Sequence, residues 1–162
     1  MSTAIIYYSE HHGNTKKLLD AIKAADPAVE LIDVTKEAKA VADAKNEDGA
    51  ENTKDLSAYD RIGIASGIYF GNFAKQVMAY AEEHLPEGKP VFFVYTQGAP
   101  AGDFLKGIRA VTGKKKCPEI GEYRCQGYDT FGPFKLVGGI AKGHPTKAEI
   151  DAAVKFYQEL PG

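Results

Sequence analysis

Short apolar runs alternate along the chain with stretches in which apolar residues recur at helical spacing. Residues 4–8, 61–66 and 90–96 are mostly apolar, β-branched or aromatic, which is typical of strands covered on both faces of a sheet. Residues 29–34 alternate more between polar and apolar side chains, and residues 120–125 form a further candidate strand. The pattern therefore predicts five strands of ordinary length.

Between these strands, and after the last one, apolar residues recur every three or four positions, as on one face of a helix. Asn14 or Thr15 can cap the first helix and Asn72 the third, while Pro27 and Pro86 end the same two helices. The helices are expected within residues 14–25, 36–55, 72–85, 103–113 and 146–160.

Strands and helices thus alternate with short connections, which predicts an α/β fold with helices on both faces of a parallel sheet. Thr146 and Glu149 form a capping box that marks the last helix. Residues 36–55 predict a short helix followed by an exposed loop near residues 46–52. No repeat or linker divides the chain, so residues 1–162 are expected to form one domain. Ligands of such sheets bind beyond the carboxyl ends of the strands, which singles out the loops after the first, third and fourth strands.

The loop between the first strand and the first helix, residues 9–15, has the composition of an anion site. A helix start presents free N–H groups and the positive end of the helix dipole. Gly13 lets the backbone approach a ligand closely, and Ser9, Asn14 and Thr15 can donate hydrogen bonds to phosphate oxygens. The same residues would also make an ordinary tight turn with a helix cap, and spacing alone does not separate these alternatives.

Other interpretations of the glycines and histidines are weaker. The dinucleotide-binding pattern Gly-x-Gly-x-x-Gly is absent from this loop. Gly138 and Gly143 are followed by His144 and Pro145, where a triphosphate-binding loop needs Lys and then Ser or Thr. The adjacent histidines 11 and 12 lack the spacing of a metal-binding pair, so no metal site is expected.

Three segments together resemble the flavin-binding loops of flavodoxins and their relatives. Residues 6–9 with 13–15 resemble the FMN-phosphate loop, residues 66–72 the second flavin loop and residues 95–99 the third, in the same order along the chain. The resemblance implies a flavodoxin-like three-layer sandwich, a five-stranded parallel sheet in the order 2-1-3-4-5, and FMN as the cofactor. The cofactor-binding residues that it implies are Ser9, His11, His12, Gly13, Asn14, Thr15, Ser66, Gly67, Ile68, Tyr69, Phe70, Gly71, Asn72, Thr96, Gln97, Gly98 and Ala99.

The resemblance also implies roles within these loops. Tyr69 is the candidate for stacking on the isoalloxazine ring, although Tyr69 and Phe70 can equally well just cover the end of the sheet. In the family, one peptide of the second loop can change its orientation when a ring nitrogen gains a proton. Gly71-Asn72 matches that peptide best, and a plain helix N-cap at Asn72 would explain the same pair. Residues 96–99 can offer backbone N–H groups to the pyrimidine edge of the ring.

The sequence departs from the family pattern at two places. Glu10 and His12 stand where flavodoxins usually carry hydroxyl residues. Two phosphate donors are thereby lost, and Glu10 would repel a phosphate if it pointed inward, while Ser9 and one of the two histidines can compensate. The chain also has no tryptophan, the residue that many flavodoxins stack on the ring.

Residues 126–143 are rich in glycine and aromatic residues. They can form a lid or docking surface beside the flavin, or a compact loop packed under its own aromatic side chains; we favour the compact loop. Cys117 and Cys125 are expected to be buried thiols rather than a redox pair, because we expect a cytoplasmic location, where disulfides are rare.

Charge and composition narrow the function. A net charge of -2 gives no indication of a nucleic-acid surface, and no apolar run approaches the roughly 20 residues of a membrane span. Three functions fit: an electron carrier that shuttles electrons between redox partner proteins, an NAD(P)H- or quinone-linked flavin oxidoreductase, and a non-redox binding module. The carrier is favoured over the enzyme because no nicotinamide site is visible, although the chain lacks the strong acidity of classical flavodoxins.

Overall fold

The computed structural model describes residues 1–10, 12–44, 54–99, 101–130 and 132–162. His11 and the loop expected near residues 46–52 therefore lie outside the described residues. In chain order the elements are β1 (Thr3–Tyr8), α1 (Asn14–Ala25), β2 (Glu30–Asp33), α2 (Val34–Ala44), the 3-10 turn η1 (Leu56–Ala58), β3 (Arg61–Tyr69), β4 (Asn72–Phe73), α3 (Lys75–His84), β5 (Val91–Gln97), α4 (Lys106–Lys114), β6 (Glu119–Gln126), the 3-10 turn η2 (Gly132–Val137) and α5 (Lys147–Glu159).

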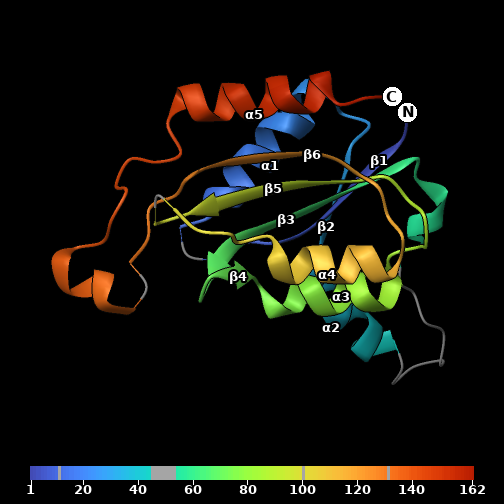
Figure 1. Cartoon of the computed structure of the whole chain (residues 1–162), viewed down its shortest axis with the longest axis horizontal. Coiled ribbons are helices and arrows are strands. Elements are labelled where there is room, and N and C mark those ends of the chain that lie inside the picture. The colour runs from blue at the N-terminus through green and yellow to red at the C-terminus, as the bar shows by residue number, and fades with distance from the viewer. Residues whose placement is uncertain (11, 45–53, 100, 131) are drawn as a thin grey trace.

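Five of the strands form one parallel sheet in the order β2-β1-β3-β5-β6. The sheet confirms the predicted order, with the two-residue β4 added as an antiparallel partner of β3. Helices α1 and α5 cover one face of the sheet, and α2, α3 and α4 cover the other (Figure 1). The chain therefore has the predicted α/β architecture, with helices on both faces of the sheet.

The alternating direction of strand side chains builds a core on each side of the sheet. In β1, Ala4, Ile6 and Tyr8 belong to the core under α2–α4, while Ile5 and Tyr7 belong to the core under α1 and α5. Every residue of β1 and of β5 is buried, whereas β6 at the edge is mostly half-buried or exposed. Strands buried on both faces explain the nearly continuous apolar runs in the sequence.

Helix α2 begins two residues earlier than predicted, at Val34, and α4 three residues later, at Lys106. The predicted caps are wrong at the starts of α1 and α3. Gly13, with a φ of 62°, is the N-cap of α1 and has no side chain that could cap the helix; Asn14 and Thr15 instead bond to distant segments. Asn72 does not cap α3, because it belongs to β4 and α3 begins at Lys75. The causes differ: at α1 distant partners bind the side chains that a local cap would have used, whereas Asn72 pairs with Tyr69 in a local hairpin.

The other end of the chain follows the prediction closely. Thr146 caps α5, and its hydroxyl accepts a hydrogen bond from the Glu149 backbone N–H while the Glu149 carboxylate accepts one from the Thr146 N–H. Cys117 and Cys125 are buried free thiols, as expected. None of the described helices is long and apolar enough to cross a membrane.

Candidate functional site

The carboxyl ends of β1, β3 and β5 meet at one end of the molecule, and the three predicted loops meet there too. β1 and β5 both pair with β3, in parallel and in register at Tyr8↔Ser66 and Gly67↔Thr96. A first cavity, here called the polar cavity, opens between the loops at the start of α1. It is lined by Glu10, Asn14, Thr15, Gly67, Ile68, Tyr69, Thr96, Gln97, Gly98, Gly127, Tyr128 and Asp129.

A second cavity adjoins the polar cavity and is mainly apolar, and we call it the apolar cavity. It is lined by Ile68, Phe70, Gly71, Gln97, Gly98, Ala99, Phe104, Asp129, Pro133 and Phe134. The two cavities share Ile68, Gln97, Gly98 and Asp129. Together they form one cleft that runs from the start of α1 to an apolar opening between the second and third loops.

The polar end of the cleft is built on the first turn of α1. The hydroxyls of Thr15 and Thr96 are hydrogen-bonded at 2.9 Å in a buried contact, which ties the helix start to the end of β5. The side-chain amide of Asn14 donates to the Tyr128 carbonyl at 2.8 Å. Ser9 Oγ accepts the backbone N–H of Lys16 at 3.2 Å. The Lys16 N–H is thus satisfied within the chain, and the anion-attracting start of α1 lies at Asn14 and Thr15, which line the polar cavity.

The charged side chains of the cleft work against that attraction. Glu10 and Asp129, both carboxylates, line the polar cavity. Asp129 lies directly on Gly98, since a Cβ added to Gly98 would come within 2.5 Å of Asp129 Oδ2. Burial and a hydrogen bond with the Glu10 side chain raise the pKa of Tyr8 to about 12. The phenol of Tyr8 stays protonated beside Glu10. Among the described residues that line the polar cavity there is no Lys or Arg, so an anion there would depend on helix N–H groups.

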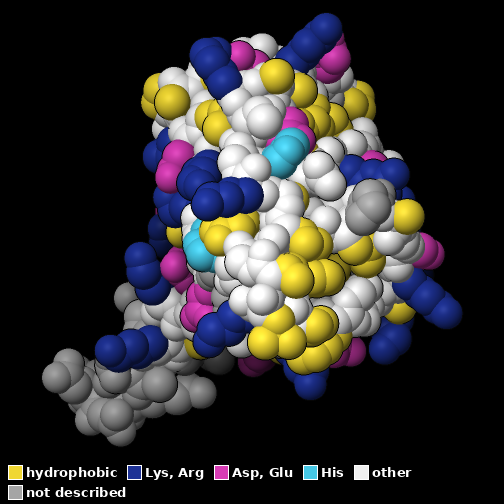
Figure 2. Space-filling view, turned by 90° about the vertical axis from the view of Figure 1, so that its left-hand side faces the viewer, with side chains coloured by type: hydrophobic (Ala, Val, Ile, Leu, Met, Phe, Trp, Pro, Cys, Tyr) yellow, Lys and Arg dark blue, Asp and Glu magenta, His cyan; other side chains and the backbone are white. Residues whose placement is uncertain are grey.

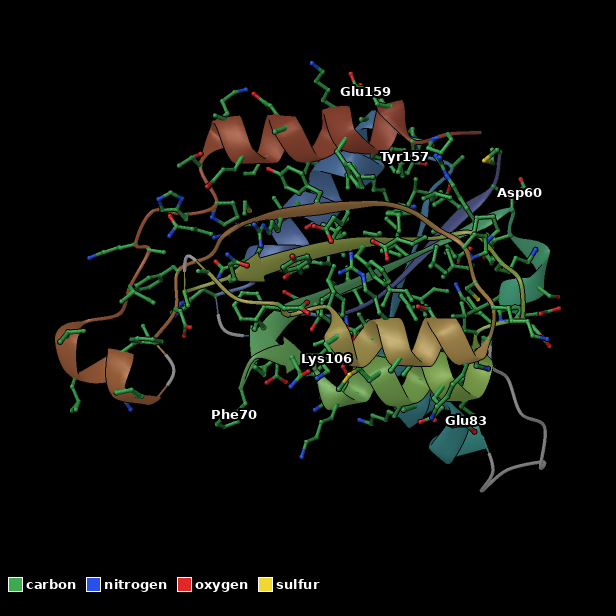
Figure 3. The ribbon with its side chains drawn as sticks, viewed as in Figure 1. Asp60, Phe70, Glu83, Lys106, Tyr157 and Glu159 are labelled. Atoms are coloured by element: carbon green, nitrogen blue, oxygen red, sulfur yellow. The ribbon has the colours of Figure 1, made fainter. Side chains whose placement is uncertain are left out.

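The second loop is a tight hairpin rather than a helix cap. Tyr69 pairs with Asn72 across a two-residue turn, in which Phe70 and Gly71 have φ angles of 51° and 78°. Two successive positive φ values define the type I′ turn, whose first position favours Asn, Asp or Gly. Phe70 occupies that position with 85% of its surface exposed, and it projects from the hairpin tip away from the sheet (Figure 3).

The two aromatic residues of this loop face different surroundings. Tyr69 lines the polar cavity and meets Tyr8 edge-on with ring centroids 5.7 Å apart. It also lies over Gly67, where an added Cβ would come within 3.3–3.4 Å of the Tyr69 phenol. Burial raises the pKa of Tyr69, against a backbone hydrogen bond from Glu10 that lowers it. Tyr69 as the stacking residue stays a prediction, and Phe70 is placed on the wall of the apolar cavity.

Residues 127–130 complete the cleft, although the sequence pattern predicts no individual role for them. The His12 and Tyr128 rings are 4.3 Å apart between centroids, and His12 Nε2 and Thr130 Oγ1 are 3.1 Å apart. The Gly127 N–H donates to the Gln97 carbonyl at 3.0 Å. These contacts join residues separated by up to 118 positions along the chain, so no local pattern could have revealed them. The only signal was the density of glycine and aromatic residues in the segment.

The rest of the 126–143 segment has features of both alternatives considered for it. The Tyr128 ring packs on Gly139, and the Tyr128 hydroxyl donates to the Gly138 carbonyl at 3.0 Å, as in a loop held by its own aromatics. Leu136 and Val137, however, are 89% and 74% exposed. Figure 2 views this end of the molecule and shows hydrophobic side chains grouped on it among Lys and Arg side chains.

The remaining predicted site residues have different positions. Ser66 Oγ donates to the Gly67 carbonyl and accepts the Ala74 N–H at 2.9 Å, so it secures the approach to α3. Gly71 and Ala99 line the apolar cavity, and Asn72 lines a further cavity on the α3 side of the hairpin together with Lys75. Ser9, His12 and Gly13 shape the first loop without lining the polar cavity.

Comparisons with known proteins agree with this architecture. A sequence model of a family described as "Flavodoxin domain" matches residues 5–103. The chain is 32% identical over 166 residues to an uncharacterized protein of Methanocaldococcus jannaschii, with 99% of this chain and 98% of that protein covered.

Solved structures extend the likeness to the whole fold. One is a flavodoxin from the domain Archaea, with a TM-score of 0.61, 15% identity, and 96% of this chain and 93% of that chain covered. Another is general stress protein 14 from Treponema denticola in complex with FMN, with a TM-score of 0.61, 11% identity, and 98% and 94% covered. At such low identities these likenesses concern the fold alone.

Proposed function

The chain belongs to the flavodoxin domain family, and we propose that it binds FMN and transfers electrons between redox partner proteins. The observation that carries the proposal is the two-part cleft. Its polar cavity lies at a helix start and its apolar cavity lies between two loops, and they meet at Ile68, Gln97, Gly98 and Asp129. FMN has the same division, with a phosphate at one end and a flat, largely apolar ring at the other.

The residues present fit such a cofactor in three respects. The N–H groups of the first turn of α1 can bind the phosphate. The hairpin tip and the third loop, represented by Phe70 and Ala99, lie on the walls of the apolar cavity. Gln97 Oε1 is buried and has no hydrogen-bond partner among the described residues, so the cleft contains an acceptor that can receive a donor from a ligand.

The carboxylates of Glu10 and Asp129 shape how the phosphate would be held. Because both line the polar cavity, they disfavour a further negative charge nearby. Neutral donors must then supply the affinity for the phosphate. The hydroxyls of Thr15 and Thr96, which are hydrogen-bonded to each other, are such donors in the cavity wall. When bound, FMN would supply reversible redox chemistry in one- or two-electron steps, and the chain would supply position and exclusion of water.

The surroundings of the cleft favour a protein partner over a small substrate. Phe70, Leu136 and Val137 are large apolar side chains that remain exposed. Phe70 lines the apolar cavity, and Leu136 and Val137 belong to η2, which lines the same cavity with Pro133 and Phe134. Exposed apolar groups of this kind are typical of surfaces that contact other proteins. In the proposed role, these exposed side chains would hold a redox partner protein against the cleft that would bind the cofactor.

The decisive experiment is a titration of the apo-protein with FMN and, separately, with riboflavin, followed by quenching of flavin fluorescence. We expect saturable binding of one FMN per chain at micromolar concentrations and at least tenfold weaker binding of riboflavin, because a charge-assisted hydrogen bond contributes about 1.5–3 kcal/mol. Thr15→Ala should reduce the ratio of the FMN affinity to the riboflavin affinity. Thr35→Ala, at the start of α2, should leave this ratio unchanged. Absence of saturable FMN binding would refute the proposal.

A second measurement separates the carrier from an oxidoreductase. During stepwise anaerobic photoreduction, a carrier should show two resolved one-electron stages. Reduction in a single two-electron stage, together with rapid reduction by NAD(P)H, would refute the carrier function and favour the oxidoreductase.

A further inference from the structure

Two segments beside the apolar cavity carry lysines and no carboxylates. Residues 67–78 contain the hairpin and the start of α3 with Lys75, and residues 132–146 contain η2 with Lys135; neither segment includes Asp or Glu. The chain as a whole has 22 Asp and Glu against 20 Lys and Arg, so acidic residues are missing here and not everywhere. The local charge at these segments is therefore positive, although the net charge of the chain is negative.

The hairpin has a lysine on each of its two neighbouring helices. Lys75 lines a cavity together with the exposed Phe70. Lys106 is the first residue of α4, and this helix packs on the hairpin, because a Cβ added to Gly107 would come within 3.0 Å of Asn72 Oδ1. Figure 3 shows Lys106 at the start of α4 near the hairpin that carries Phe70.

η2 repeats this combination of positive charge and exposed apolar surface. Lys135 directly precedes Leu136 and Val137, and all three side chains are exposed. Phe134 of η2 and Phe70 of the hairpin line the same apolar cavity, so the two elements lie at one opening. We call the combined region the docking surface. Its apolar members are Phe70, Leu136 and Val137, and its basic members, here called the rim lysines, are Lys75, Lys106 and Lys135.

The rim lysines have no partner of opposite charge. None of them forms an ion pair or a side-chain hydrogen bond with another described residue. Exposed lysines at the other end of α4 do form ion pairs, since Lys114 bonds Glu82 and Lys116 bonds Glu87. The positive charge of the docking surface is thus available to a second molecule.

Two carboxylates lie near the docking surface, and both have contacts within the chain. Asp103, three residues before Lys106, accepts the Leu105 N–H at 3.3 Å. Asp129 lies directly on Gly98, where the polar and the apolar cavity meet. Neither carboxylate forms an ion pair with a rim lysine.

An apolar centre with uncompensated positive charges beside it is complementary to a protein face that carries carboxylates around an apolar contact. We propose that the docking surface binds an acidic redox protein; the redox role of this partner rests on the proposed function. Three lysines fall short of the roughly four to eight Lys and Arg that mark binding to an anionic membrane. A nucleic-acid surface is also disfavoured, because the isoelectric point of the chain is about 6.1.

The test uses two small probe proteins of opposite charge, acidic zinc-substituted rubredoxin and basic cytochrome c. Binding is measured by the backbone amide chemical shifts of the isotopically labelled chain. Rubredoxin should shift amides of residues 67–78, 132–137 and the first turn of α4, and raising the salt from about 20 to about 200 mM should weaken its binding. Cytochrome c should leave these amides unchanged. The triple variant Lys75→Gln, Lys106→Gln, Lys135→Gln should bind rubredoxin at least about fivefold more weakly.

A matched triple variant, Lys114→Gln, Lys116→Gln, Lys155→Gln, removes the same charge from exposed positions outside the docking surface. It should bind rubredoxin within about twofold of the wild type. An equal loss of affinity in the two triple variants would show that only net charge matters and would overturn the inference. Absence of shifts at the docking surface, or tighter binding of cytochrome c than of rubredoxin, would overturn it as well.

Two further comparisons separate this inference from its alternatives. Tighter binding to phosphatidylserine vesicles than to rubredoxin would replace the acidic protein with a membrane surface and overturn the inference. Because the chain is titrated without FMN, failure of the proposed function would appear separately, as absence of FMN binding. A chain that binds FMN but shows no rubredoxin binding at the docking surface would refute this inference alone.

Discussion

Replacing Phe70 by asparagine should stabilise the chain, although it removes a large apolar side chain. Phe70 has a φ of 51°, a left-handed conformation that costs an L-residue roughly 1–2 kcal/mol. Asparagine pays less of this cost because its side chain bonds locally to the backbone, and Asn-Gly is the preferred pair in a type I′ turn. Gly71 already provides the second residue of that pair.

The expected change in stability is the backbone strain relieved at Phe70 minus the buried apolar area lost with its side chain. Because Phe70 is 85% exposed, its replacement forfeits little buried apolar area. We therefore expect a net gain of about 1 kcal/mol in the free energy of unfolding, equivalent to roughly 2–4 °C in melting temperature for a domain of this size.

Urea unfolding followed by circular dichroism measures this difference directly. Phe70→Leu is the control, because it also removes the ring but keeps a side chain that resists positive φ. Phe70→Asn should exceed Phe70→Leu in stability by about 1 kcal/mol. Equal stability of the two variants would refute the argument that the turn is strained. A chain that keeps a strained, exposed phenylalanine where asparagine would be more stable favours a contact role for that ring.

Two further predictions concern α5. The Tyr157 hydroxyl donates to Asp26 Oδ2 at 2.8 Å and is the main cause of the lowered pKa of Asp26, whose ordinary value is 3.8. The resulting stabilisation is present above a pH of 3.8 and is lost as pH falls through the lowered pKa of Asp26. Tyr157→Phe should therefore destabilise the chain more at neutral pH than in strong acid. A difference in urea midpoints that does not change with pH would contradict this prediction. Thr146→Ala removes the capping hydroxyl that accepts the Glu149 N–H and should cost about 1 kcal/mol of unfolding free energy, and an unchanged midpoint would show that the cap contributes nothing.

The sequence predicted most of the fold because its signals are local. Two-sided burial makes β1 and β5 nearly continuously apolar, and the five expected strands appear in the expected sheet order. The capping box of α5 is local as well, since both of its partners lie within four residues. Signals of this kind depend on period and capping chemistry, which a sequence displays directly.

The errors arose where polar groups have two uses. Asn14 and Asn72 both suit a helix cap by type and position. In the folded chain the Asn14 amide bonds the Tyr128 carbonyl, and Asn72 pairs with Tyr69 in a hairpin. The short β4 gives no periodic signal because it has two residues. Local propensity could not decide these cases. The partner of Asn14 is distant in sequence, and the hairpin that contains Asn72 requires a positive φ at Phe70, which is unusual for phenylalanine.

The hairpin also restricts how the second loop can respond to a bound ring. Residues 69 and 72 are paired, and Ile68 pairs with Phe73. Phe73 is 1% exposed and lies edge-on to Phe93 with ring centroids 6.0 Å apart, so it cannot move without disturbing the core. A Cβ added at Gly71 meets nothing within 4 Å, so space is not limiting there and only the backbone conformation is. The pairing of Tyr69 with Asn72 leaves Phe70 and Gly71 as the two unpaired residues of the turn, and a change of orientation at Gly71-Asn72, which the resemblance implies, stays a prediction.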